Sequence, residues 1–196
     1  MFRAKGKTKT KKMFQITSEA RSCLNCALGE NRKNVVLGTG NLDADIVLIG
    51  EAPGRKEDES GLPFVGSAGK LLNNLLDSVG IERDDIFIGN ILKCGPPGNR
   101  RPKRSELDAC EGYLKRQLEI IEPKVIAPMG NSALKYFQEL YELDKLVIGE
   151  THGKVYIVEA GWGIVFLIPL YHPAAAIYRR VLLDELKEDM KKLTLI

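Results

Sequence analysis

Four cysteines, two of them in a Cys-x-x-Cys pair, are the residues whose spacing points most directly to chemistry. Cys23 and Cys26 form the pair, whereas Cys94 and Cys110 lie far along the chain and sixteen residues apart. Four thiolates can hold a zinc ion or an iron–sulfur cluster. A second Cys-x-x-Cys would favour a zinc ribbon, and the sequence lacks one. The spacing therefore leaves zinc and iron–sulfur open, with four unpaired buried cysteines as the alternative.

Three polar side chains stand near the ends of apolar runs. Glu51 and His172 follow such runs closely, and Asn90 lies near the end of another. The carboxyl ends of parallel strands meet at one edge of a sheet, where open α/β proteins bind ligands. We therefore predict one pocket that contains a carboxylate, an amide and an imidazole. The alternatives are that Asn90 only caps a turn and that His172 is structural, as we expect for His152.

The stretch Gly50–Gly66, GEAPGRKEDESGLPFVG, connects the first apolar run to a helical pattern. Its glycines and prolines predict a long irregular loop. Four acidic residues and one aromatic residue lie in it: Glu51, Glu57, Asp58, Glu59 and Phe64. The Gly-x-x-x-x-Gly-Lys-Ser/Thr spacing of a phosphate loop is missing. The alternative to a ligand-binding loop is a solvated acidic one.

The elements that must position these residues alternate along the chain. Apolar runs predict strands at Asp45–Ile49, Ile86–Leu92, Lys124–Met129 and Val165–Leu170, with a hairpin at Leu146–Ile148 and Lys154–Val158. Helical patterns lie at Ile16–Leu28, after Ser67, at Ser105–Ile121 with a capping box of Ser105 and Asp108, at Gly130–Leu140, and from Ala174 onward. Such alternation predicts an α/β fold with a mostly parallel sheet covered on both faces.

Composition limits the kind of protein. The 196 residues are 44% hydrophobic, which fits one domain, at residues 14–196. Six of the cations lie in residues 1–13, which contain no acid, so we expect a basic, disordered tail there. The sequence leaves open whether this tail contacts nucleic acid or only aids solubility. No apolar run reaches the length of a membrane span, so we expect a cytoplasmic, monomeric protein without membrane contact. Abundant Lys and Glu with little Gln indicate a thermophilic source.

Five segments in a fixed order carry a family resemblance. GEAPG, PFVGSAGKLL, GNILKC, PPGNRRP and HPAAAIYRR resemble motifs of the family four uracil-DNA glycosylases, the thermostable iron–sulfur class, over roughly residues 20–190. The resemblance implies an αβα sandwich, here with a central sheet of four strands, and a prokaryotic source. It also implies a [4Fe–4S] cluster on Cys23, Cys26, Cys94 and Cys110, which decides against zinc. In this family the cluster is structural.

The resemblance further implies that the protein flips uracil out of DNA and hydrolyses its N-glycosidic bond, leaving an abasic site. Phe64 would stack on the base, Asn90 would read uracil N3–H and O4, and Glu57 would exclude the thymine methyl group. His172 would donate to uracil O2 as negative charge develops there. Backbone groups near the base would come from Gly50, Glu51 and Ala52.

Two departures from the family pattern affect the details. Ala52 stands where the best-known uracil glycosylases carry a water-orienting Asp, and Glu51 is the nearest carboxylate. Ala176 replaces the leucine that enters the minor groove, so Ile177 or Tyr178 is the candidate wedge. Candidate phosphate contacts, with surface charge as the alternative for each, are Arg100, Arg101, Lys103, Arg104, Arg179 and Arg180.

The predicted partner is uracil-containing DNA, single- or double-stranded. Two other functions remain as alternatives to the glycosylase, namely a non-catalytic iron–sulfur nucleic-acid-binding module and a redox protein of the Cys-x-x-Cys type.

Overall fold

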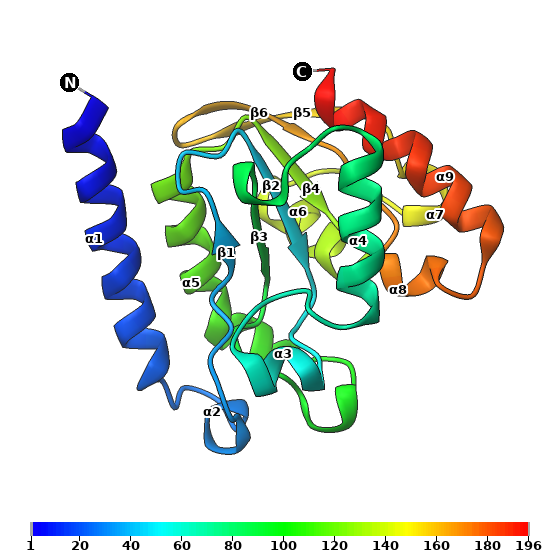
Figure 1. Ribbon diagram of the computed structural model, residues 1–196. Coiled ribbons are helices and arrows are strands. Elements are labelled where there is room, and N and C mark those ends of the chain that lie inside the picture. The colour runs from blue at the N-terminus through cyan, green and yellow to red at the C-terminus, as the bar shows by residue number, and fades with distance from the viewer. Residues whose placement is uncertain (1, 196) are drawn as a thin grey trace.

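The computed structural model describes residues 2–195, with side chains from residue 6 onward. Within that range six strands form one sheet in the order β1-β3-β2-β4-β6-β5 (Figure 1). The strands are β1 Thr39–Gly40, β2 Ile46–Gly50, β3 Phe87–Asn90, β4 Val125–Pro128, β5 Tyr156–Ala160 and β6 Gly163–Leu167. The inner strands β3, β2, β4 and β6 run parallel, and β1 and β5 pair antiparallel at the two edges. The mostly parallel α/β sheet is confirmed, and the prediction of four strands is corrected to four parallel strands plus two edge strands.

Helices cover both faces of this sheet. They are α1 Phe2–Arg21, α2 Leu28–Asn31, α3 Arg55–Ser60, α4 Ser67–Ser78, α5 Arg104–Ile121, α6 Asn131–Leu140, α7 Ile148–Thr151, α8 Pro173–Ala176 and α9 Arg180–Lys191. Helices α4, α8 and α9 lie on one face, whereas α5 and α6 pack on the other, with α1 outside α5 (Figure 1). The fold is therefore the predicted αβα sandwich.

Strand β2 shows why the central strands are continuous apolar runs. Val47, Leu48 and Ile49 are all fully buried. Because strand side chains alternate between faces, Leu48 packs toward α4 and α9, whereas Val47 and Ile49 pack toward α5 and α6. A strand with helices on both sides has no solvent-facing position, so the sequence shows no alternation there.

The predicted disordered tail is wrong for the residues that the structure describes. Met1 lies outside them, but residues 2–13 form the first part of α1. The ammonium of Lys9 pairs with Asp43 at 2.9 Å and donates to the backbone oxygen of Ile121 at 3.1 Å, at the end of α5. Farther along α1, Ile16 is buried in a small cluster beside α5. The lysine-rich segment is thus helical, and its Lys9 contacts groups of the folded domain.

Several element boundaries also differ from the prediction. The loop Gly50–Gly66 contains the short helix α3. Residues 146–148 form no strand, and β5 pairs instead with β6. The C-terminal helical pattern is interrupted between α8 and α9. Helix α5 begins one residue earlier, with the Glu106 carboxylate accepting from the Lys103 N–H at 2.7 Å, so the predicted capping box is wrong.

No helix in the described part of the chain is both long and apolar enough to cross a membrane.

Candidate active site

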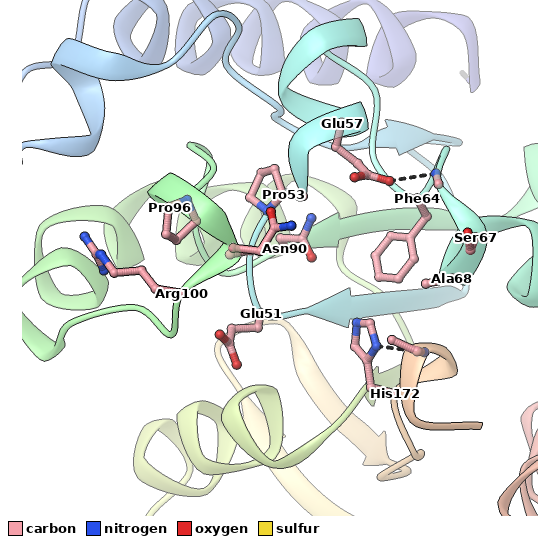
Figure 2. Close-up of a pocket in the computed structure, with 15 residues that line it drawn as sticks. Glu51, Pro53, Glu57, Phe64, Ser67, Ala68, Asn90, Pro96, Arg100 and His172 are labelled. Atoms are coloured by element: carbon pink, nitrogen blue, oxygen red, sulfur yellow. Dashed lines mark hydrogen bonds between the residues drawn. The ribbon is translucent and has the colours of Figure 1, made fainter. Parts of the chain in front are cut away.

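A pocket opens at the carboxyl ends of β2 and β3, the edge of the sheet that the sequence singles out. It has a volume of about 450 Å³, within the range of small-molecule binding sites. Figure 2 shows side chains converging on it from the loops after β2 and β3 and from the start of α8. Predicted site residues that line it are Glu51, Ala52, Glu57, Phe64, Asn90, Arg100 and His172. The fold thus brings together residues that are spread over more than half of the chain.

Gly50, the last residue of β2, allows two pocket side chains to approach each other. A Cβ atom at this position would lie 2.5 Å from Asn90 Oδ1 and 2.8 Å from Phe64 Cζ. Both distances are too short for any larger residue without movement of the pocket. Gly50 therefore leaves the space that Asn90 and Phe64 occupy, and its predicted backbone contact with the base stays a prediction.

Glu57 fixes the backbone around Phe64. One of its carboxylate oxygens, Oε1, accepts from the N–H groups of Val65 at 2.9 Å and Gly66 at 2.8 Å. Figure 2 shows one of these bonds as a dashed line from the Glu57 carboxylate. Phe64 has a φ of 53°, a left-handed conformation that costs energy for a bulky residue. The two hydrogen bonds stabilise that conformation and turn the Phe64 ring into the pocket. The predicted contact of Glu57 with C5 of a base stays a prediction.

His172 lies across the pocket from Phe64, with ring centroids 5.8 Å apart. Its Nδ1 accepts from the Ala174 N–H at 3.1 Å, so the proton of the neutral ring is on Nε2. Burial of the ring lowers the pKa of His172 to about 4, and the Glu57 carboxylate opposes this shift. At neutral pH the imidazole is therefore an uncharged donor.

Asn90 and Glu51 provide the other polar groups of the pocket. The Asn90 side chain is 3% exposed, and no hydrogen bond from the described residues occupies its amide. An amide that lines a pocket without a protein partner keeps its donor and its acceptor available for a ligand. Glu51 lines the pocket with its carboxylate free of ion pairs within the described chain. The pocket therefore offers an amide, a neutral imidazole and a carboxylate to a flat aromatic ligand on Phe64.

The predicted DNA-contacting residues divide into two groups along the chain, and only Arg100 lines the pocket. Arg100 lines the pocket, and its guanidinium forms two hydrogen bonds with Glu106, of 2.9 and 2.5 Å. Arg104 instead pairs with Asp108 and Glu139, which balance its charge, while Arg101 is exposed. The second group surrounds the break between α8 and α9, where the exposed residues are Ile177, Tyr178, Arg179 and Arg180. Tyr178 is 92% exposed, far more than Ile177 at 38%.

The four cysteines line a separate cavity between the end of α1, the segment after β3, and α5. All four are free thiols. The Lys93 N–H donates to Cys110 Sγ at 3.4 Å, and Arg32 donates to Cys94 Sγ at 3.5 Å. Such N–H···S bonds are typical around thiolate ligands of iron–sulfur clusters.

The arrangement of the thiols bears on the choice between a single ion and a cluster. Among the side chains that the structure describes, in residues 6–195, no three of His, Cys, Asp or Glu converge as the ligands of one metal ion do. In a cluster each iron takes its own thiolate, so the ligands surround a larger group. The four thiols line one cavity, so these are the residues that could hold a metal group.

Sequence reasoning missed three residues that support these sites. Lys93 is buried between the two cavities, Glu106 orients Arg100, and Asn99 lines the pocket rim. The capping pattern Lys103-x-x-Glu106 could have identified Glu106. His152, predicted to be structural, pairs with the buried Asp189 at 2.7 Å.

Comparisons with known proteins show the family of this chain. Residues 37–194 match the family model of the uracil DNA glycosylase superfamily. The chain is 47% identical to a type-4 uracil-DNA glycosylase of Archaeoglobus fulgidus over 178 residues, 91% of this chain and 89% of the relative. It is 43% identical to the type-4 enzyme of Saccharolobus solfataricus, covering 90% of this chain and 82% of the relative. The type-4 enzyme of Thermotoga maritima is 41% identical, with 90% and 92% covered. Fold, pocket and relatives agree: this chain belongs to the type-4 uracil-DNA glycosylases of the uracil DNA glycosylase superfamily.

Proposed function

We propose that this pocket receives a uracil flipped out of DNA and that its residues divide the work of recognition, leaving-group stabilisation and water activation. The chain is a uracil-DNA glycosylase, an enzyme of DNA repair that excises uracil. One observation best supports the proposed division of roles. The Asn90 amide lines the pocket together with Phe64 and has no hydrogen-bonding partner among the described residues. A base inside a duplex is inaccessible, so the nucleotide must leave the stack to reach that amide.

Recognition rests on Phe64 and Asn90. Phe64 is 7% exposed and presents its ring as a stacking platform for the base. The Asn90 amide accepts from uracil N3–H and donates to O4, whereas cytosine offers the opposite pattern at that edge. Backbone groups of Gly50, Glu51 and Ala52 hold the base from the β2 side. Glu57 blocks space for a methyl group at C5, and it also fixes Phe64.

His172 stabilises the leaving group. Cleavage of the glycosidic bond leaves negative charge on the uracil ring, and the Nε2–H of His172 donates to O2 as that charge develops. The neutral ring suits this role, because it needs no counter-charge in the empty pocket and gains its full interaction only in the transition state.

Glu51 is the carboxylate that we assign to the attacking water. Ala52 carries no polar group, and one oxygen of Glu57 is engaged by two backbone N–H groups, whereas Glu51 faces the pocket without a partner among the described residues. A carboxylate there can orient the water and stabilise the positively charged sugar.

We assign the DNA phosphate contacts from the exposure and the pairing of the arginine side chains. Arg101, Arg179 and Arg180 are exposed and free to neutralise phosphates, Arg100 is held at the pocket mouth by Glu106, and Arg104 is the weakest candidate because two carboxylates pair with it. We assign the minor-groove wedge to Tyr178, the more exposed residue of the pair, with Ile177 beside it. The enzyme acts as a monomer on prokaryotic DNA in the cytoplasm.

We further propose a [4Fe–4S] cluster on Cys23, Cys26, Cys94 and Cys110. The group would supply no chemistry to bond cleavage. Its four ligands come from three separate segments of the chain, so the cluster would hold these segments together.

The test is excision itself. The protein is incubated with an oligonucleotide that contains one uracil, and alkali then cleaves any abasic site. We expect strand cleavage at the uracil and none in a matched oligonucleotide with thymine. Binding of the uracil oligonucleotide without cleavage would instead favour the non-catalytic iron–sulfur module.

A further inference from the structure

Lys93 is a lysine in the interior of the protein. It is 1% exposed, although lysine is almost never fully buried unless it is paired. Its ammonium donates to the backbone oxygen of Asn90 at 2.7 Å, three residues earlier in the chain. Across the described residues no carboxylate forms an ion pair with it. A buried cation with one neutral partner needs a counter-charge.

The groups beside Lys93 that can carry negative charge are cysteine thiols. Lys93 lines the four-cysteine cavity, its own N–H donates to Cys110 Sγ at 3.4 Å, and Cys94 is the next residue. A cluster held by four thiolates is negatively charged as a whole, so it supplies the charge that the ammonium lacks. Lys93 also touches the reading residue Asn90, and it therefore lies between the two sites.

The segment that Lys93 spans is short and tightly held at both ends. The Ile91 N–H donates to the Gly50 oxygen at 3.0 Å, and the Val36 N–H donates to the Lys93 oxygen at 2.8 Å. The Asn90 oxygen has the Lys93 ammonium as its hydrogen-bonding partner at the end of β3. Without that donor a buried carbonyl is left unpaired, and the end of β3 has reason to shift. A shift of about 1 Å in a substrate-binding residue can lower a rate by about a hundredfold.

From these contacts we infer that Lys93 is a positioning residue that couples the cysteine centre to base recognition. Its ammonium is the counter-charge of the cluster and at the same time fixes the end of β3, so that the Asn90 amide faces the pocket. This inference rests on the proposed cluster and on the proposed reading role of Asn90. One residue thus contacts both sites, although the cluster is remote from the reacting bond.

Two substitutions separate the charge from the hydrogen bond. Lys93→Met keeps the apolar stem and removes both, whereas Lys93→Gln removes the charge and keeps a donor. The matched control is Lys70→Met, the same change at an exposed site on α4. Each protein is purified with its iron, and three quantities are measured: the half-life of iron release to a chelator, the single-turnover excision rate at saturating enzyme, and the Kd for uracil-containing DNA.

We expect Lys93→Met to release iron about tenfold faster and to excise uracil at least about tenfold more slowly, with an unchanged Kd because the phosphate contacts lie at the rim. Lys93→Gln should release iron as fast as Lys93→Met but recover most of the excision rate. If Lys93 had a purely structural role, Lys93→Met and Lys93→Gln would show equal losses in the half-life of iron release and equal losses in the excision rate. That result would overturn the inference. So would a Lys93→Met protein that matches Lys70→Met, and if Lys93→Met does not fold, slow iron release from Lys93→Gln overturns it. A wild-type protein without iron or without excision would refute the proposed function instead, before any variant is compared.

Discussion

Replacing Asn90 by aspartate tests the proposed reading of the base at a single atom. The change turns the amide donor into a second acceptor and leaves the shape nearly the same. Because Asn90 is 3% exposed and its amide forms no hydrogen bond with a described residue, the substitution breaks no hydrogen bond within the protein. Its effect should therefore fall on the substrate.

The size of the effect follows from the pairing. Uracil presents N3–H as a donor and O4 as an acceptor. A carboxylate still accepts from N3–H but can only repel O4, and an unmatched buried pair costs about 1–3 kcal/mol, more when a charge is involved. Since about 1.4 kcal/mol is tenfold in rate, Asn90→Asp should slow uracil excision by at least about tenfold to a hundredfold. Cytosine offers an amino donor and an N3 acceptor, so weak cytosine excision requires a protonated carboxyl and should increase at lower pH.

The assay is single-turnover excision of uracil, at saturating enzyme, by wild type and Asn90→Asp. Asn99→Asp is the matched control, because it makes the same change at an exposed position of the same pocket. Iron content and melting temperature are measured for all three proteins. Near-wild-type uracil excision by a folded Asn90→Asp protein would refute the reading role and with it the pocket assignment.

Four further predictions address other parts of the structure. His172→Gln should slow excision about tenfold or more, and because the pKa of His172 is about 4, neither protein should show a rate inflection near 6.5. As the pH falls from 6.5 toward 4, the unfolded chain takes up a proton that the folded ring refuses, so wild type should lose stability relative to His172→Gln; parallel melting curves across that window would contradict this. Glu57→Ala should release Phe64 and reduce excision far more than Glu57→Gln, whose amide oxygen still accepts from the Val65 and Gly66 N–H groups; equal losses would argue that charge, and not loop geometry, matters. Deleting residues 1–13 should lower the melting temperature by about 2–4 °C for each kcal/mol of unfolding free energy that is lost. The salt dependence of DNA binding should stay unchanged, because Lys9 pairs with groups at the end of the sheet opposite the pocket. A flatter salt dependence would place the basic helix on DNA. Cys94→Ser should lower iron content and melting temperature before it alters excision per folded molecule, as measured by iron analysis beside active-site titration.

Local pattern was enough to predict most of the fold. The apolar runs before Glu51 and His172 are strands because residues buried on both faces must all be apolar. The amphipathic runs between them are helices because only one face of each helix is buried. Parallel strands bring their carboxyl ends together, so the sequence also predicted that Glu51, Asn90 and His172 share one pocket. These inferences depend on periodicity, which is a property of neighbouring residues.

Tertiary structure decided what distant groups do for one another. Lys9 lies in a helix and its ammonium contacts Asp43 and the end of α5, whereas composition alone suggested disorder. Glu57 bonds to the backbone beside Phe64, and Lys93 bonds to Asn90. Both contacts depend on which side chains the folded loops enclose. Burial sets the strength of such contacts, and burial is a property of the packed molecule. The sequence by itself determined the elements and the residue types at their ends, whereas packing decided which of those residues are buried, charged or free to bind a base.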